Sequence, residues 1–129
     1  MSNIKISKSE QFYHENQAWV RSLDFYKLEN TFLKTRLSEV VDNGVDKDSL
    51  ALAEHFQNQF IVKDEFIQEL LYDTQYQQSL LQAGFIRLDF IPDNKLIKKQ
   101  EKLRNEIEYL EKDFVRLRNE FNKYLVTVL

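Results

Sequence analysis

Cysteine is absent from this 129-residue chain, and glycine and proline are nearly so, with two copies and one copy. The lack of cysteine excludes disulfides, thiolate metal sites and cysteine nucleophiles. Sheets need frequent turns, which usually depend on glycine and proline, so an all-β fold is excluded as well. With glycine only at Gly44 and Gly84, no glycine-rich phosphate loop or dinucleotide fingerprint can be formed.

Long apolar runs are also missing. No stretch approaches the ~18 consecutive apolar residues of a membrane span. The N-terminal sequence MSNIKISKSE lacks the apolar core of a signal peptide. We therefore expect a soluble, cytoplasmic protein that does not contact a membrane.

The composition instead suits a folded helical protein. Apolar residues make up 43% of the chain and charged residues 30%, enough to fill a core and keep a wet surface. The length fits a single domain over residues 1–129. The net charge of −3 is too mild to indicate a partner, but the middle third is acidic and the last third slightly basic, which favours their packing together.

Two breaks divide the chain into three rods of similar length. The first is at residues 42–49, where Gly44 suits a helix end and Asp46 or Asp48 suits the next helix start. The second is at residues 84–94, around Pro92, where Asp89 or Asp93 could cap. Helices over residues 8–43, 46–83 and 93–128 follow. Their matching lengths predict an all-α, antiparallel up-down-up bundle of three long helices.

Rows of mostly apolar residues, each interrupted by one to three polar ones, recur in these segments at alternating steps of three and four, which is typical of coiled-coil-like packing. In the last segment the row is Leu96, Gln100, Leu103, Ile107, Leu110, Phe114, Leu117, Phe121, Tyr124 and Val128. In the first it is Phe12, Asn16, Trp19, Leu23, Tyr26, Asn30, Leu33, Leu37 and Val40. The middle row is Ala53, Phe56, Phe60, Lys63, Ile67, Leu70, Thr74, Gln77 and Leu81, and Leu52, Phe66, Leu71 and Leu80 widen it.

The middle segment leaves an alternative open. The polar run at residues 75–78 could break the helix near Asp73 and Thr74 and give a four-helix bundle, although the helices would then differ greatly in length. Residues 85–91 are too apolar for a free loop. We expect helix to about Ala83 and a compact apolar connection after it.

Asn30 and Gln59 are candidates for a buried polar layer. Antiparallel pairing across the first break places Asn30 opposite Gln59, and a buried amide without partners costs ~1–3 kcal/mol. We predict that the two side chains bond and fix the register of the first two helices. Alternatively, both lie at the edges of their rows and point outward.

Metal and catalytic sites receive little support. A di-iron bundle needs Glu-x-x-His motifs, and neither of the two histidines has a glutamate three residues before it. His55 and Gln59, one turn apart, are weak metal candidates, whereas we favour a solvated His14 and a His55 at the core boundary. No cofactor is expected. The carboxylates follow surface spacing, and Ser38, Ser49 and Ser79 have no histidine at a spacing that suggests a dyad, although distant residues could meet in the fold. The sequence therefore predicts no enzyme.

A basic cluster opens the last segment. It comprises Lys95, Lys98, Lys99, Lys102 and Arg104. Nucleic-acid binding would require basic excess across the domain, and aromatic residues often lie nearby. Because glutamates interleave and the chain is acidic overall, we interpret the cluster as a solvated helix face and expect no nucleic-acid partner.

A second apolar row lies in the first segment. Phe25, Leu28 and Phe32 recur at steps of three and four on the side away from the main row. They form an interaction surface if that side faces water, and they belong to the core if the first helix is buried on two sides. The C-terminal residues 124–129 are likewise apolar and could mediate association.

The segment EHFQNQFI at residues 54–61, with RLSEV at residues 36–40, resembles small uncharacterised helical proteins of bacteria. The resemblance covers the first two segments. It implies a helical fold with no assigned activity, and it directs attention to His55, Gln57, Asn58 and Gln59.

The expected function is a non-catalytic helical interaction or scaffolding module. It would hold a protein partner or a second copy of the chain. The alternative is a bundle that binds a small ligand or a metal around His55.

Overall fold

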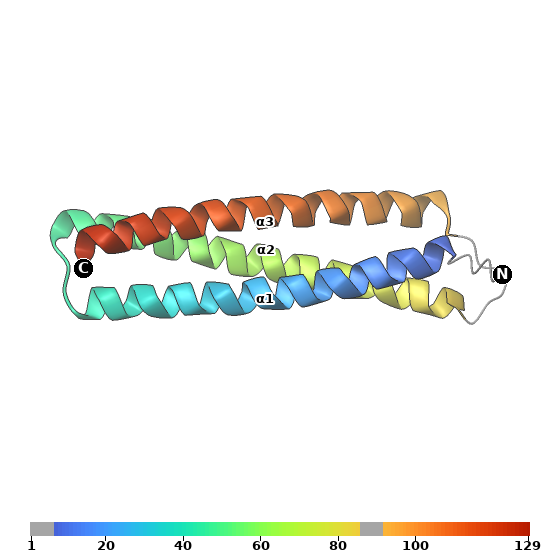
Figure 1. The fold of residues 1–129 in the computed structure, drawn as a ribbon, viewed down its shortest axis with the longest axis horizontal. Helices are drawn as coiled ribbons and strands as arrows, with labels where there is room; N and C mark the ends of the chain where they lie inside the picture. Colours follow the sequence, from blue (N-terminus) through green and yellow to red (C-terminus); the bar gives the residue numbers. More distant parts are fainter. Residues whose placement is uncertain (1–6, 86–91) are drawn as a thin grey trace, which may run out of the picture.

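The computed structural model describes residues 7–85 and 92–129, which form three long antiparallel helices lying side by side in a rod (Figure 1). They are α1 (Lys8–Asp42), α2 (Lys47–Phe85) and α3 (Asn94–Val128). The part of the chain so described contains no strand. The expected all-α three-helix bundle is therefore confirmed.

Helix α2 is continuous, so the alternative four-helix bundle is wrong. Thr74 and Gln77 lie inside the helix and are buried. The amide nitrogen of Gln77 donates to the Leu96 carbonyl at 2.9 Å, and the polar run is thus accommodated by a contact with α3. The helix also extends to Phe85, two residues beyond the expected end at Ala83. The compact connection expected after it falls on residues 86–91, outside the described residues.

The helix ends follow from particular side chains. Gly44 has a φ of 89°, the left-handed conformation that was expected just after α1. The Asp46 carboxylate accepts a hydrogen bond from the Ser49 amide at 2.7 Å, and that bond lowers the pKa of Asp46. The Asp93 carboxylate accepts one from the Leu96 amide at 2.8 Å. Asp46 and Asp93 are therefore the caps of α2 and α3.

The spacing of the apolar rows correctly predicted the core. All eight interior positions of the α3 row are buried, namely Gln100, Leu103, Ile107, Leu110, Phe114, Leu117, Phe121 and Tyr124. Both asparagines of the α1 row are fully buried. In α2, Leu71 is buried, but Leu52 and Leu80 are exposed, so the apolar face is narrower than expected there. These two leucines lie beyond the surface that α1 and α3 cover.

Helix α2 packs against both neighbours, and two apolar clusters fill the bundle. One is mainly aliphatic, around Leu23, Ile67 and Leu110. The other is aromatic, and in it the rings of Phe60 and Phe121 meet edge to face at 5.1 Å. Among the helices described, none combines the length and the apolar character that spanning a membrane requires.

Candidate functional site

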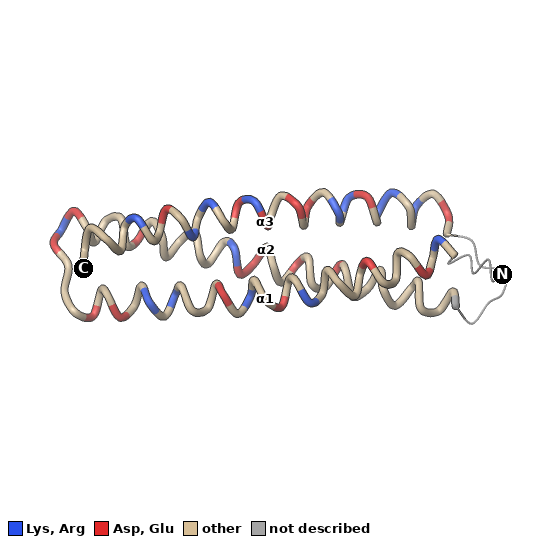
Figure 2. Tube along the Cα trace, viewed as in Figure 1, with Lys and Arg blue, Asp and Glu red and all other residues tan. Residues whose placement is uncertain are grey.

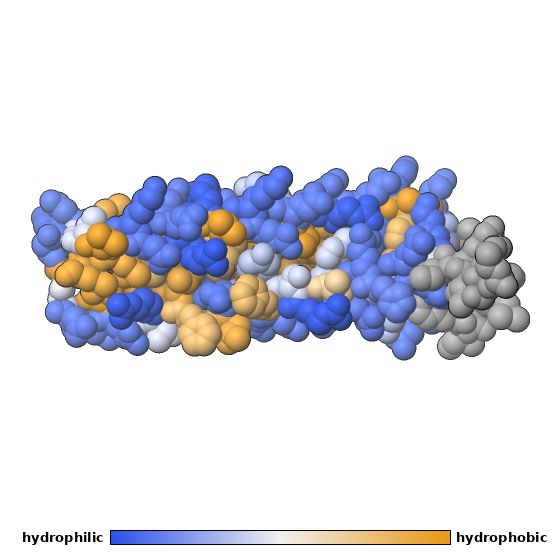
Figure 3. Space-filling view, viewed as in Figure 1, coloured by the Kyte–Doolittle hydropathy of each residue, from blue (hydrophilic) through white to orange (hydrophobic). Residues whose placement is uncertain are grey.

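The outer face of α1 carries an exposed apolar patch formed by Phe25, Leu28 and Phe32. Their exposed fractions are 52%, 56% and 62%. Figure 3 shows apolar side chains gathered on α1 near the middle of the bundle. The alternative in which these residues belong to the core is therefore wrong, because α2 and α3 cover the opposite side of α1 and leave this side to the solvent. We call these three residues the α1 patch.

The α1 patch is joined to the core through aromatic contacts. The ring of Phe25 meets Tyr26 at 5.5 Å, and Tyr26 meets the buried Phe114 of α3 at 5.1 Å, both edge to face. Burial and the nearby Glu111 raise the pKa of Tyr26, and they outweigh the opposite effect of Arg118. Because Tyr26 is held by α3, the patch projects from a well-supported part of α1.

Asn30 forms the predicted polar layer, but with other partners. Its side chain is fully buried, and its nitrogen donates to the Phe60 carbonyl at 2.9 Å and to the Asp64 carboxylate at 2.6 Å. Gln59 is half-buried and is not the partner of Asn30. The prediction of an Asn30–Gln59 pair is thus wrong, because the groups that Asn30 reaches belong to residues one and five positions beyond Gln59. Each step along a helix rotates the side chain by about 100°, so a small error in register changes which side chain faces Asn30.

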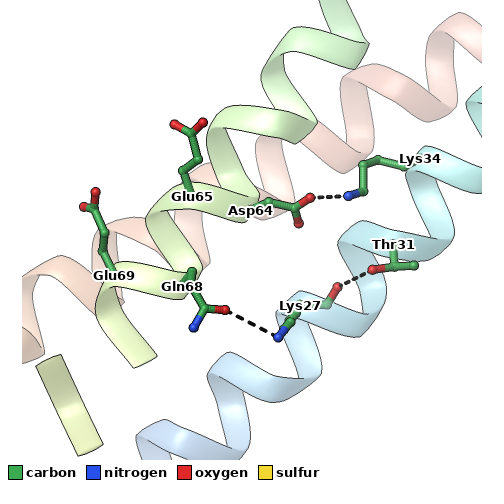
Figure 4. Close-up of a pocket in the computed structure, with 7 residues that line it drawn as sticks. All are labelled: Lys27, Thr31, Lys34, Asp64, Glu65, Gln68 and Glu69. Atoms are coloured by element: carbon green, nitrogen blue, oxygen red, sulfur yellow. Dashed lines mark hydrogen bonds and ion pairs between the residues drawn. The ribbon is translucent and has the colours of Figure 1, made fainter. Parts of the chain in front are cut away.

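The surface groove next to this layer is filled by contacts between α1 and α2 (Figure 4). Asp64 pairs with Lys34, and the Lys27 ammonium donates to the Gln68 side chain at 3.4 Å. Figure 4 shows Glu65 and Glu69 pointing away from α1. The side chains that face one another are therefore bonded to each other, and they fix the register of two helices.

A second polar layer, which the sequence analysis did not identify, lies between α1 and α3. The Gln100 side-chain nitrogen donates to Asn16 at 2.6 Å and to Glu15 at 2.9 Å. Glu15 also forms a two-bond ion pair with Arg104, at 2.6 and 2.9 Å. The available signal was that Asn16 and Gln100 are polar residues in otherwise apolar rows.

The weak metal candidates remain apart from any ligand cluster. His55 is exposed, not at the core boundary as expected, and its ring meets Phe56 edge to face at 5.5 Å. Gln59 lies half-buried one turn away. Within residues 7–85 and 92–129, no three His, Cys, Asp or Glu side chains are grouped in a way that could hold a metal ion. His14 is exposed, as expected.

The C-terminal apolar residues divide between core and surface. Tyr124 is buried, and its hydroxyl donates to the Ser49 carbonyl at 2.9 Å, which ties the end of α3 to the start of α2. Burial and the charge of Asp46 raise the pKa of this hydroxyl. Val126 and Leu129 are exposed by 81% and 75%. The end of α3 therefore both closes the core and presents isolated apolar side chains.

The chain matches no protein-family model, no curated protein and no solved structure. The likeness of residues 54–61 to small bacterial helical proteins thus remains an expectation.

Proposed function

We propose that the chain is a non-catalytic interaction module that uses the α1 patch to hold a protein partner. One observation carries the proposal: three large apolar side chains, each more than half exposed, lie in a row on one helix. Polar residues such as Asp24 and Lys27 flank the row and are also exposed. An apolar patch with a polar rim is typical of protein interfaces.

The size of the α1 patch indicates the kind of contact. If a large aromatic or aliphatic side chain buries up to ~200 Å², three side chains exposed by about half offer roughly 300 Å². A stable interface buries ~800 Å² on each partner. The patch therefore supports a weak or transient contact, and a tight complex would have to extend along α1. Spacing of three and four residues suits a partner that also presents a helix.

Sedimentation velocity of the full chain over a concentration series tests the proposal. Leu28→Glu removes the centre of the patch, and Leu52→Glu is the matched control because Leu52 is 51% exposed on α2. Self-association is supported if wild type and the Leu52 variant exceed the 15.6 kDa monomer mass while the Leu28 variant does not.

A second experiment tests whether the partner is a different protein. A photo-crosslinking residue is placed at position 28 or at position 52, and crosslinking is carried out in the native cell. A product specific to position 28, and lost when Phe32→Glu is added, supports the proposal. The proposal fails if the wild type stays monomeric at every concentration and positions 28 and 52 give the same products.

The alternative function, a ligand- or metal-binding bundle around His55, would need groups that converge on that imidazole. His55 instead lies exposed beside Phe56. We therefore place the α1 patch first.

A further inference from the structure

A groove of about 820 Å³ between α2 and α3 brings two sets of residues together near the end of α2. The volume lies within the ~300–1,000 Å³ typical of small-molecule sites. The α2 wall is formed by Tyr72, Tyr76 and Leu80, and the α3 wall by Lys95, Lys98, Lys99 and Lys102, with Asp73, Gln77, Asp93 and Leu96 between them. We call it the α2–α3 groove.

The register of the two walls is fixed by contacts at the floor. Gln77 donates to the Leu96 carbonyl at 2.9 Å, and Lys99 approaches Asp73 at 3.4 Å. Tyr76, next to Gln77, therefore lies level with the first two turns of α3. The lysines that the sequence presents as a solvated face thus line one side of a groove whose other side is aromatic.

The tyrosines offer free ring surface. Tyr72 and Tyr76 are exposed by 69% and 59%, and they lie one turn apart on the same face of α2. Exposed aromatic rings beside positive charge are the means by which proteins hold nucleotide bases, because every base has a π-face that can stack. Leu80, exposed by 39%, continues the row by one more turn.

Positive charge in the α2–α3 groove is not fully neutralised. The Asp93 carboxylate is engaged in capping α3, and the Asp73 carboxylate is engaged with Lys99. Among the residues that the structure describes, no carboxylate lies within ion-pair distance of Lys95 or Lys98. Figure 2 shows basic residues recurring along the first half of α3. Two lysines at the groove are therefore available to an anion.

We propose that the α2–α3 groove binds an aromatic phosphate, namely a nucleotide, either free or within a single strand. The base stacks on Tyr72 or Tyr76, and the phosphate lies at Lys95 and Lys98. Lysine binds phosphate as a point charge, and stacking on tyrosine adds binding energy without selecting a sequence. The groove lies on α2 and α3, away from the α1 patch. The nucleotide proposal and the protein-interface proposal can therefore be tested independently of each other.

Amide chemical shifts of the isotope-labelled full chain, followed during titration, test the proposal. The probes are AMP, inorganic phosphate, adenosine and a short oligoadenylate. We expect AMP to shift amides at residues 72–80 and 95–102, and to bind at least tenfold more tightly than phosphate or adenosine. Inorganic phosphate lacks the base, whose stacking is worth roughly tenfold. Adenosine lacks the charged group that Lys95 and Lys98 would bind. Affinity should fall with added salt.

Matched variants locate the site. Tyr76→Ala and the double variant Lys95→Glu, Lys98→Glu should each weaken AMP binding roughly tenfold or more. The controls lie elsewhere on α3: Tyr109→Ala, whose side chain is 63% exposed, and Lys123→Glu. Both controls should bind AMP like the wild type. Each variant is checked for an unchanged helical spectrum.

The titrations distinguish a free nucleotide from a nucleic-acid strand. Equal binding of AMP and oligoadenylate supports a free nucleotide as the source, and tighter binding of oligoadenylate supports a strand. The proposal is overturned if AMP causes no shifts, if phosphate binds as well as AMP, or if Lys123→Glu weakens binding as much as the groove variants do. Displacement of AMP by a more tightly bound acidic tyrosine-containing peptide would also overturn it.

Discussion

The Lys63 ammonium of α2 forms an ion pair with the Asp113 carboxylate of α3 inside the bundle, where the two side chains are only 9% and 12% exposed. Arg116 adds two hydrogen bonds to the same carboxylate, at 2.7 and 3.1 Å. Lys63 lies in the apolar row of α2, at a position where the helix spacing predicts an apolar core side chain. The ion pair with Asp113 offsets the cost of burying the Lys63 charge.

Removal of one member of this pair should destabilise the bundle more than removal of both. Lys63→Met leaves Asp113 buried with only Arg116 to neutralise it, and we expect a loss of about 2–3 kcal/mol in the free energy of unfolding. The double variant Lys63→Met, Asp113→Leu replaces the pair by apolar side chains and should come within about 1 kcal/mol of the wild type. Urea denaturation measures both. Equal losses in the single and double variants would show that Asp113 without Lys63 carries no burial cost.

The Asp113 carboxylate should also affect how the stability of the bundle depends on acid pH. Burial alone would raise the pKa of Asp113, but the hydrogen bonds from Lys63 and Arg116 outweigh it and hold this pKa below its ordinary value. The charged form is therefore favoured by folding. Its stabilising effect is present above the unfolded-state pKa of about 3.9 and is lost as the pH falls through the lower folded-state value.

We expect the stability of the wild type to fall more steeply below about pH 4 than that of the double variant Lys63→Met, Asp113→Leu. Comparison of the two proteins by urea denaturation at a series of acid pH values cancels the contribution of the other carboxylates. Parallel curves would mean that Asp113 does not bind its proton differently in the folded and unfolded states.

Asn30 should matter for stability, whereas exposed asparagines should not. Its side chain donates to Asp64 and to the Phe60 carbonyl in the interior, so Asn30→Ala removes a buried donor and should cost about 1–3 kcal/mol. Asn58→Ala, on the exposed side of α2, is the control and should change stability by less than about 0.5 kcal/mol. A similar effect of the two changes, in thermal or urea unfolding, would contradict the role given to the polar layer.

The sequence was sufficient for the helices and for most core positions, because burial follows the spacing of side chains on one face. Even Lys63, Thr74 and Gln77 are buried where the row places them. Partners were harder to predict. The expected register paired Asn30 with Gln59, whereas Asn30 bonds to the Phe60 carbonyl and to Asp64, one and five residues further along α2.

The candidate surface was only half predictable for a related reason. Spacing placed Phe25, Leu28 and Phe32 together, but the same spacing fits a buried and an exposed face. The choice depends on which side of α1 the other two helices cover, and that is a property of packing. The α2–α3 groove was missed because Tyr76 and Lys98 belong to different helices, and their proximity follows only from the register set by contacts such as Gln77 with Leu96.

The turn between α1 and α2 provides a test that isolates backbone conformation. Gly44 has a φ of 89°, and a Cβ added there would meet no atom within 4 Å. Gly44→Ala should therefore destabilise the bundle only through the strain of the left-handed conformation, by about 1 kcal/mol. Gly44→Asn should cost less, because asparagine tolerates this conformation better than alanine does. Thermal unfolding should rank the three proteins in the order glycine, asparagine, alanine. An alanine variant as stable as the wild type would show that the turn can relax to a negative φ without loss of packing.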